Sequence, residues 1–305
     1  MIAQVRSFPH RDVPRSPDAA HLWGIILAGP AGPLSTDFGR DRLARLGRRA
    51  RLSAGDDVFG DTLRRASRLI ADDRLVAVLT RADLPAYADD LAARPCVRRL
   101  VQPRYRGSAA EIFLPILAIA REDPEATVVV LPADHLVGRD GRLMEHVARA
   151  ACAASWRPDL PLLVAARARR GEATYGWIEP GDPVDGLESL SIRAVKRFVH
   201  DRSTHGLRWI GEPAPSLSTV AIVAKARALV ELGERYVPEV LETLEPLAEA
   251  VSAKEAALLC EAIYECMPYA SVSRELLERG HHFGVLAVPD VAWGEADLRA
   301  ALLAS

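Results

Sequence analysis

Lysine is scarce in this 305-residue chain, although basic residues as a class are abundant. Lys196, Lys225 and Lys254 are the only lysines among 39 basic residues, and the remainder are arginine. A phosphate-binding P-loop needs a lysine directly after its glycine-rich turn, and no lysine precedes residue 196. The sequence therefore excludes a P-loop, and any lysine-dependent chemistry has three candidates.

Cysteine and long apolar runs are scarce as well. The four cysteines form no C-x-x-C pair, which disfavours a disulfide framework or a zinc site and favours reduced thiols. No apolar run approaches the roughly 20 residues that cross a bilayer. Residues 1–20 lack the apolar core of a signal peptide and are expected to form a flexible leader. We therefore expect a cytoplasmic protein that makes no contact with a membrane.

Charge and hydropathy predict a folded protein that does not bind nucleic acid. The formal net charge is -2 and 49% of the residues are hydrophobic. A protein surface that binds a polyanion is usually strongly basic, and this composition instead allows a large buried core. We expect a single domain over 21–305, with a core at 21–200 and a helical C-terminal portion at 201–305.

The first two thirds of the chain alternate between short apolar strands and helix-like segments. Strands are predicted at 24–29, 74–80, 97–103, 127–135 and 160–167, and helices at 56–73 and 108–123, with Ser108 as a candidate N-cap. This alternation predicts a Rossmann-like α/β fold, a mostly parallel sheet with helices on both faces. In such sheets ligands bind at the carboxyl ends of strands, where Gly29–Leu34 and Pro132–His135 fall.

The last third is predicted to be richer in helix. A strand is expected at 191–199, a mostly helical stretch with a break at Pro238 at 221–250, and helices at 254–267 and 272–280. A final strand at 283–288 precedes a tail, 292–305, that is expected to turn into a short helix.

Five segments, in their order along the chain, carry a family resemblance. GIILAG at 24–29 is followed by glycines with G-x-x-G spacing, which alone indicates little more than a tight turn. Together with VQPRYRGSAAEI, VVVLPADH, YGWIEPG and RYVPEVLETL it resembles the sugar-1-phosphate nucleotidyltransferases, above all the mannose-1-phosphate guanylyltransferases. The resemblance implies the nucleotide-diphospho-sugar transferase fold and a Mg²⁺-assisted reaction. In that reaction a sugar 1-phosphate, here mannose 1-phosphate, attacks the α-phosphorus of GTP and pyrophosphate leaves.

The same resemblance implies a set of substrate-binding residues. On the nucleotide side they are Leu27, Ala28, Gly29, Gly32, Gln102, Arg106 and Ser108. On the sugar side they are Tyr175, Gly176 and Glu179. Structural alternatives stay open, because Trp177 can be a core residue and Arg104 and Arg106 can be solvated.

Two acidic residues are implied as metal ligands. Asp134, in LPADH, takes the family's catalytic metal position, and Glu295, in AWGEA, falls where a second carboxylate is expected. Carboxylate oxygens are the ligands that Mg²⁺ prefers. The alternatives are that Asp134 caps the following turn and that Glu295 begins a helix.

Several positions depart from the family pattern, and each departure removes a donor or a positive charge. Pro30 and Pro33 remove backbone N–H groups from the opening loop. FVHDR replaces the family's F-x-E-K-P, so that His200 stands for glutamate and Asp201 for lysine. We expect Lys196 to lie on the wrong face of its strand to take the place of the lysine that Asp201 replaces. Losing one preorganised donor typically costs about 3 kcal/mol of transition-state stabilisation.

These departures predict weak turnover unless arginines at 38–52 restore the lost charge. A non-catalytic homologue that binds a sugar nucleotide or a partner enzyme is therefore the alternative function. A metal-dependent glycosyltransferase is a third alternative, and a homo-oligomer is compatible with each.

Overall fold

The computed structural model of the chain describes residues 16–28, 58–133, 135–137, 140–167, 176–200, 216–249, 253–289 and 293–295. Most of the predicted leader, the opening glycine loop and the arginine-rich segment 38–52 lie outside these ranges.

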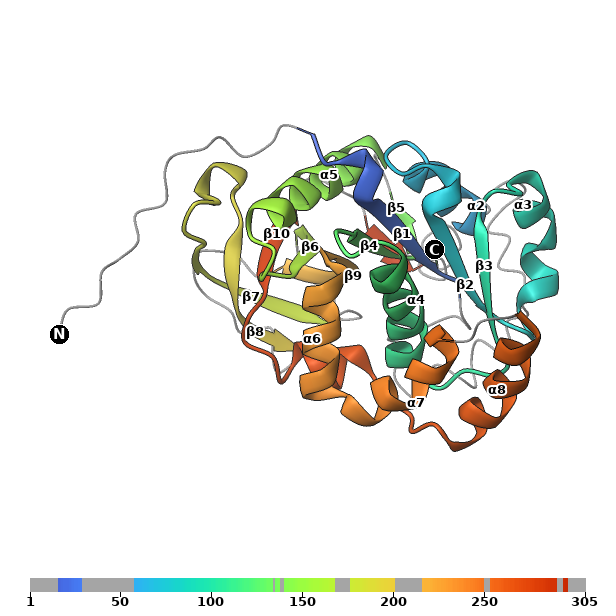
Figure 1. The fold of residues 1–305 in the computed structure, drawn as a ribbon. Helices are drawn as coiled ribbons and strands as arrows, with labels where there is room; N and C mark the ends of the chain where they lie inside the picture. The colour runs from blue at the N-terminus through green and yellow to red at the C-terminus, as the bar shows by residue number, and fades with distance from the viewer. Residues whose placement is uncertain are drawn as a thin grey trace, which may run out of the picture.

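A nine-stranded sheet forms the centre of the molecule (Figure 1). Its strands are β1 (Leu22–Leu27), β2 (Leu75–Thr80), β3 (Arg98–Gln102), β4 (Thr127–Pro132), β6 (Leu162–Arg167), β7 (Trp177–Pro183), β8 (Arg193–Val199), β9 (Ser216–Lys225) and β10 (Gly284–Val288). Their order across the sheet is β3-β2-β1-β4-β9-β6-β10-β8-β7. Within the described ranges, every strand of this sheet except β8 and β9 runs in one direction. The predicted mostly parallel sheet is confirmed.

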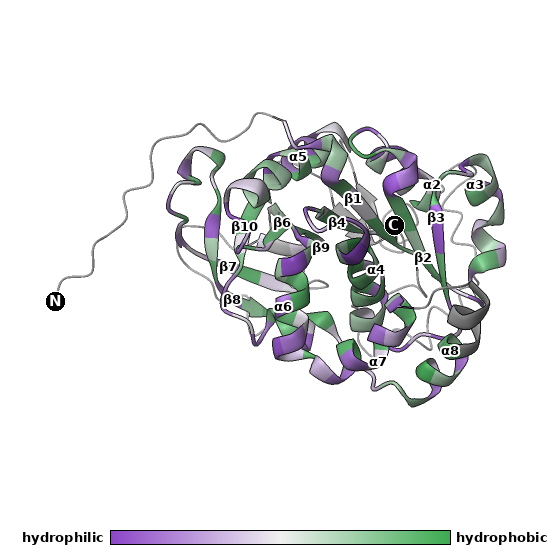
Figure 2. Cartoon of the chain, viewed as in Figure 1, coloured by the Kyte–Doolittle hydropathy of each residue, from purple (hydrophilic) through white to green (hydrophobic). Residues whose placement is uncertain are grey.

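Helices cover both faces of the sheet, as predicted. They are α2 (Val58–Ala66), α3 (Ala88–Ala93), α4 (Ser108–Glu122), α5 (Asp140–Trp156), α6 (Ala226–Tyr236), α7 (Pro238–Glu249) and α8 (Ala253–Cys266), with short 3₁₀ turns η1 (Ala19–His21), η2 (Asp72–Arg74), η3 (Leu84–Tyr87) and η4 (Glu188–Leu190). Alternate side chains of β1 face opposite layers: Ile25 packs in the core that contains α4, α6 and α7, and Ile26 in the core that contains α2 and α5. Figure 2 shows the central strands as predominantly hydrophobic and the outer helices as mixed.

Strand β9 corrects the prediction of helix from residue 221 onward. The described part of the predicted stretch begins with a strand that continues to Lys225, and α6 starts at Ala226. β9 runs antiparallel between β4 and β6, and its residues Ala221–Ala224 are buried on both faces. A short apolar run of this kind lacks the two-residue alternation of a half-exposed strand, so its sequence does not distinguish a buried strand from a helix.

Three smaller predictions also differ from the structure. The helix predicted over 56–73 ends at Ala66, and a 3₁₀ turn precedes β2. The helix predicted over 272–280 is a π-helix, η6, at Val272–Leu277. In the tail, Trp293–Glu295 forms a strand, β11, that pairs with β5 (His135–Val137).

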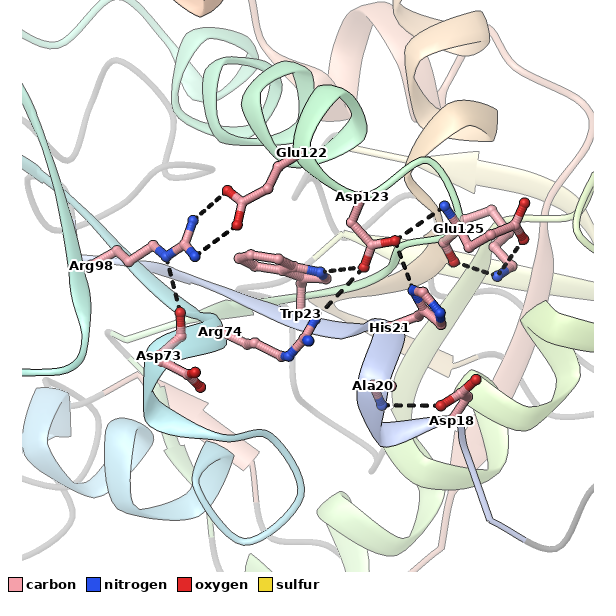
Figure 3. A network of polar contacts seen from close by, with 11 residues as sticks. Asp18, Ala20, His21, Trp23, Asp73, Arg74, Arg98, Glu122, Asp123 and Glu125 are labelled. Atoms are coloured by element: carbon pink, nitrogen blue, oxygen red, sulfur yellow. Dashed lines mark hydrogen bonds and ion pairs between the residues drawn. The ribbon is translucent and has the colours of Figure 1, made fainter. Parts of the chain in front are cut away.

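A polar network anchors the amino ends of β1 and β4 (Figure 3). The Asp123 carboxylate, which is largely buried, accepts a hydrogen bond from the Trp23 indole N–H at 2.8 Å and contacts His21 Nδ1 at 2.7 Å. It also accepts the Glu125 backbone N–H at 3.2 Å and lies 3.7 Å from an Arg74 Nη atom. Burial alone would raise the pKa of Asp123, but the hydrogen bonds from Trp23 and His21 outweigh it and hold that pKa below its ordinary value.

The Trp23 side chain is held from two directions in this network. The residue is 2% exposed, and the guanidinium carbons of Arg98 and Arg74 lie 4.6 Å and 5.2 Å from its ring centroid. Arg98 is itself fixed by two hydrogen bonds to the Glu122 carboxylate. Cation–π contacts and ion pairs thus connect β1 to the end of α4.

We predict that Asp123→Asn lowers the free energy of unfolding at pH 7 by about 1–3 kcal/mol, because it removes a buried charged acceptor. A carboxyl whose pKa is depressed by folding stabilises the protein above its unfolded pKa and loses that contribution as the pH falls through the folded value. Urea unfolding between pH 7 and pH 3 should therefore show a weaker acid dependence in the variant. Glu122→Gln, an exposed neighbour, is the control and should cost at most about 1 kcal/mol; equal losses in both would contradict the prediction.

Candidate functional site

The carboxyl ends of β1 to β4 lie side by side and form one edge of the sheet, called here the carboxyl edge. Leu27 is in register with Val78 of β2 and with Pro132 of β4. The Ala28 N–H donates to the Val78 carbonyl, and the Ala133 N–H donates to the Leu27 carbonyl, both at 2.9 Å. The predicted residues Leu27 and Ala28 are thus brought directly beside the strand that leads to Asp134.

Gln102, at the carboxyl end of β3, has a buried side chain without hydrogen bonds. Its side chain is fully buried, and neither amide atom has a partner among the described residues. The same holds for the hydroxyl of Tyr264 on α8, and burial raises the pKa of that hydroxyl well above its ordinary value. Buried polar atoms in native proteins almost always have partners, so such groups mark positions where water or a ligand is expected.

Arg106 and Ser108 contact a C-terminal segment of the chain. The Arg106 guanidinium donates to the backbone carbonyls of Tyr264 at 2.5 Å and Glu265 at 2.8 Å. The Ser108 hydroxyl oxygen accepts the Val272 N–H at 2.9 Å. The prediction that Ser108 is the N-cap of its helix is wrong, because Gly107 takes that position without a side-chain hydrogen bond. The predicted roles of both residues in nucleotide binding stay predictions.

Gly107 lets the β3–α4 loop approach that segment closely. Its φ angle is +93°, in a region that other residues rarely adopt. A Cβ atom there would lie 2.2 Å from the Ala270 carbonyl oxygen. The Ala109 N–H donates to this same oxygen at 3.1 Å. Glycine is therefore required by both the conformation and the contact.

On the predicted sugar side, Gly176 and Glu179 lie at the start of β7. The Gly176 carbonyl accepts the Ser218 N–H at 2.8 Å, and a Cβ at Gly176 would lie 3.1 Å from the Phe198 ring. Trp177, two residues before Glu179, packs partly buried against the core, in line with the core alternative.

Both carboxylate oxygens of Glu179 contact cations. Lys196 Nζ lies 2.6 Å from Oε1, and Arg197 Nε lies 3.2 Å from Oε2. The prediction that Lys196 lies on the wrong face to replace the family's lysine stays a prediction, and the contact described here is with Glu179. The pairing of β7 with β8 shifts register after Glu179, and this irregularity accompanies the contact of one carboxylate with two successive residues of β8.

The tail strand β11 brings Glu295 to the carboxyl edge. In the antiparallel pair of β5 and β11, the backbone of Glu295 lies opposite that of His135, the residue that follows Asp134 in the chain. Segments far apart in the sequence are thereby juxtaposed at the start of the tail, where a turn was expected; residues 296–305, with the short helix expected there, lie outside the described residues.

Other predicted site residues lie outside the described residues. They are Gly29, Gly32, Asp134 and Tyr175. In the part of the chain that the structure describes, no group of three or more histidine, cysteine, aspartate or glutamate side chains is arranged to hold a metal ion.

Sequence reasoning missed the contribution of residues 264–278. The only local signal is the helical periodicity of 254–267, which says nothing about which loop the helix meets. Arg104 pairs with Glu265 at 3.2 Å, and Arg81 pairs with Glu261, so α8 docks on the β2 and β3 ends through charges distant in sequence.

Comparisons with known proteins give the family resemblance independent support. The chain is 24% identical over 291 residues to the alginate biosynthesis protein AlgA of Pseudomonas fluorescens, covering 92% of this chain and 57% of the relative. Among solved structures, mannose-1-phosphate geranyltransferase from Thermus thermophilus superposes with a TM-score of 0.72 at 22% identity, over 90% of this chain and 76% of that one. The chain shares the fold of that structure, a mostly parallel sheet with helices on both faces.

A second structure, mannose-6-phosphate isomerase from Helicobacter pylori, also superposes on most of the chain. Its TM-score is 0.65 at 15% identity, covering 90% of this chain and all of that one. No family model matches the sequence. The predicted resemblance to sugar-1-phosphate nucleotidyltransferases is confirmed, and the chain spans a little over half the length of the curated relative it matches. Helices long and apolar enough to span a membrane are absent from the described ranges.

We predict that Gly107→Ala lowers the melting temperature by several degrees, because the added methyl group meets the Ala270 carbonyl and the positive φ disfavours alanine by more than about 1 kcal/mol. Gly141→Ala is the matched control, since a Cβ there has no neighbour within 4 Å. Gly141 lies near the start of α5, where alanine should be neutral or stabilising. Calorimetry of both variants checks the difference, and equal melting temperatures would contradict it.

Proposed function

We propose that the protein binds a nucleoside triphosphate and a sugar 1-phosphate, with GTP and mannose 1-phosphate as the first pair to test, and catalyses nucleotidyl transfer. A phosphate oxygen of the sugar phosphate attacks the α-phosphorus of the triphosphate; the bond from that phosphorus to the bridging β-phosphate oxygen breaks, and pyrophosphate leaves with its electron pair. The nucleotidyltransferase-type fold and the AlgA similarity support the reaction class. The base and the sugar are taken from the family resemblance.

The observation that carries the proposal is the pairing of β11 with β5. It brings Glu295 opposite the residue next to Asp134, at the end of β4, where ligands of such sheets collect. Carboxylate oxygens are the ligands that a hard divalent cation such as Mg²⁺ prefers. Asp134 and Glu295 would hold the ion, which would neutralise charge on the phosphates.

The nucleotide side of the proposal is supported by Gln102. Its carboxamide offers both a donor and an acceptor, and both lack partners among the described residues. A nucleobase edge presents the complementary pair of groups, so a base that reaches this amide would satisfy both at once. Gly176 and Glu179 would meet the sugar, with the Glu179 carboxylate held by Lys196 and Arg197.

A second candidate is a homologue that binds nucleotide sugars, or a partner enzyme, without catalysis. Two contacts favour it: the Arg106 guanidinium donates to protein carbonyls, and the Ser108 hydroxyl accepts a protein N–H. Donors that are committed to the protein leave fewer hydrogen bonds for a triphosphate.

We predict pyrophosphate release from GTP and mannose 1-phosphate in the presence of Mg²⁺, and its loss in Asp134→Ala. Mn²⁺ binding followed by electron paramagnetic resonance gives a readout that does not depend on activity. Asp134→Ala and Glu295→Gln should each weaken Mn²⁺ binding at least tenfold, whereas Glu145→Gln, an exposed acid on α5, should not.

The outcomes separate the two candidates. No release, together with a melting temperature that GDP-mannose raises, supports the binding homologue. If neither nucleotides nor nucleotide sugars shift the melting temperature, both ligand-based functions are wrong.

We predict that Gln102→Leu raises thermal stability while it weakens nucleotide binding. Replacing a buried amide that lacks partners with an apolar residue of similar volume removes a desolvation cost of about 1–3 kcal/mol. The same change removes the proposed contact to the base, and we expect at least a tenfold loss of GTP affinity by calorimetric titration. An unchanged affinity would show that Gln102 does not meet the nucleotide.

A further inference from the structure

One continuous segment, residues 264–278, contacts both residues 106–109, on the predicted nucleotide side, and the end of β8, next to the predicted sugar side. It comprises the end of α8, the connection that follows, the π-helix η6 and Glu278. Its first half contacts residues 106–109 through hydrogen bonds that run in both directions. The Arg106 guanidinium donates to the carbonyls of Tyr264 and Glu265. The Ala109 N–H donates to the Ala270 carbonyl, and the Ala270 N–H donates to the Arg106 carbonyl. The Val272 N–H donates to the Ser108 hydroxyl oxygen.

The second half of the segment ends on β8. The Glu278 carboxylate accepts the backbone N–H of His200 at 2.6 Å, and His200 is buried. His200 is the first residue after β8, the strand that pairs with β7 and contacts Glu179 of the predicted sugar side. A carboxylate that caps a backbone N–H makes a charge-assisted hydrogen bond, about twice as strong as a neutral one.

Between these two contacts the segment is packed rigidly. Val272, Leu276 and Leu277 of η6 are buried in the core shared with α4 and α6. The Gly280 N–H donates to the Leu276 carbonyl, and the Glu278 N–H donates to the Ser273 carbonyl, so the π-helix runs without a break into its last turn. π-helical turns are rare and are frequently associated with functional sites.

We propose that residues 264–278 couple the two sides of the site, with Ser108 and Glu278 as positioning residues at its ends. The proposal rests on the proposed function for its ligands, although the mechanical coupling does not. Movement of the β3–α4 loop that breaks the Val272–Ser108 contact displaces η6 and, with it, Glu278, which directly follows η6 and accepts the His200 N–H at the end of β8. Coupling of this kind requires an element that both sites contact and that has two discrete arrangements, here η6 docked on the β3–α4 loop or displaced from it.

Hydrogen exchange tests the coupling without any ligand. Glu278→Ala removes the acceptor, Glu278→Gln retains an amide oxygen that can accept the same N–H, and Glu275→Ala removes an acid of the same π-helix that pairs with Arg279. We expect Glu278→Ala to speed exchange at least tenfold in peptides spanning 106–112 and 268–274, far from the substitution. Glu278→Gln should retain most of the protection, and Glu275→Ala all of it.

The result that overturns the proposal is faster exchange in Glu278→Ala confined to 193–200 and 275–280, or equal behaviour of the alanine variants at 275 and 278. Melting temperatures measured in parallel show whether a variant has lost its fold. If Glu278→Ala unfolds, the comparison of Glu278→Gln with Glu275→Ala decides the question, because the coupling predicts partial loss in the first and none in the second.

Ligand binding extends the test to the site. Calorimetric titration of Glu278→Ala should show at least a fivefold loss of GTP affinity, although Glu278 lies next to the predicted sugar side. Ser108→Ala should reduce mannose 1-phosphate affinity in the same way, and the double variant should lose less than the product of the two losses. Independent, multiplicative losses would overturn the coupling. If the wild-type protein binds neither ligand, the proposed function fails while the exchange result stands.

Discussion

The antiparallel strand β9 is the constraint on which the rest of the structure depends. It lies between β4, which leads to Asp134, and β6, and its first residues also pair with β7, where the sugar-side glycine and glutamate lie. One strand therefore sets the distance between the two groups of candidate residues. Its side chains at 221–224 are buried in the two apolar layers alternately, so a shift of one residue would exchange those layers.

The parallel half of the sheet and its helices could be predicted from the sequence because their signals are local. Val128, Val129 and Val130 form a β-branched run in a buried strand, and the α4 segment has helical periodicity that starts next to Gly107. β9 could not be predicted in this way, because a short apolar run such as Ala221–Ala224 satisfies both helical and extended patterns. Its strand conformation results from pairing with β4 and β6, which are distant in sequence.

The candidate site shows the same division. Leu27 and Gln102 lie at the ends of β1 and β3, two strands that the sequence predicts, but the contacts of Ser108 and Arg106 depend on residues 264–272, which are remote in the sequence. Strand register likewise depends on distant residues. Glu295 lies opposite His135 because β11 pairs with β5, and the sequence of the tail does not indicate this pairing. Lys196 and Arg197 are successive residues of β8 and both contact Glu179, which strict alternation does not predict, and the β7–β8 ladder is irregular beside Glu179. The irregularity belongs to the β7–β8 pair, so the sequence of β8, which carries Lys196, does not indicate it.

The Asp123 network lies at the opposite end of the sheet from the proposed chemistry. Trp23, His21 and Asp123 hold the amino ends of β1 and β4, whereas the candidate ligands gather where these strands finish. The part of the molecule that secures folding is thus physically remote from the part that would select a substrate. Prolines can therefore replace other residues in the opening loop, and cations can be lost from it, without lowering the stability that the Asp123 network gives to β1 and β4. A lineage built on this plan is free to exchange one chemistry for another, or to abandon catalysis, and still inherit a stable protein.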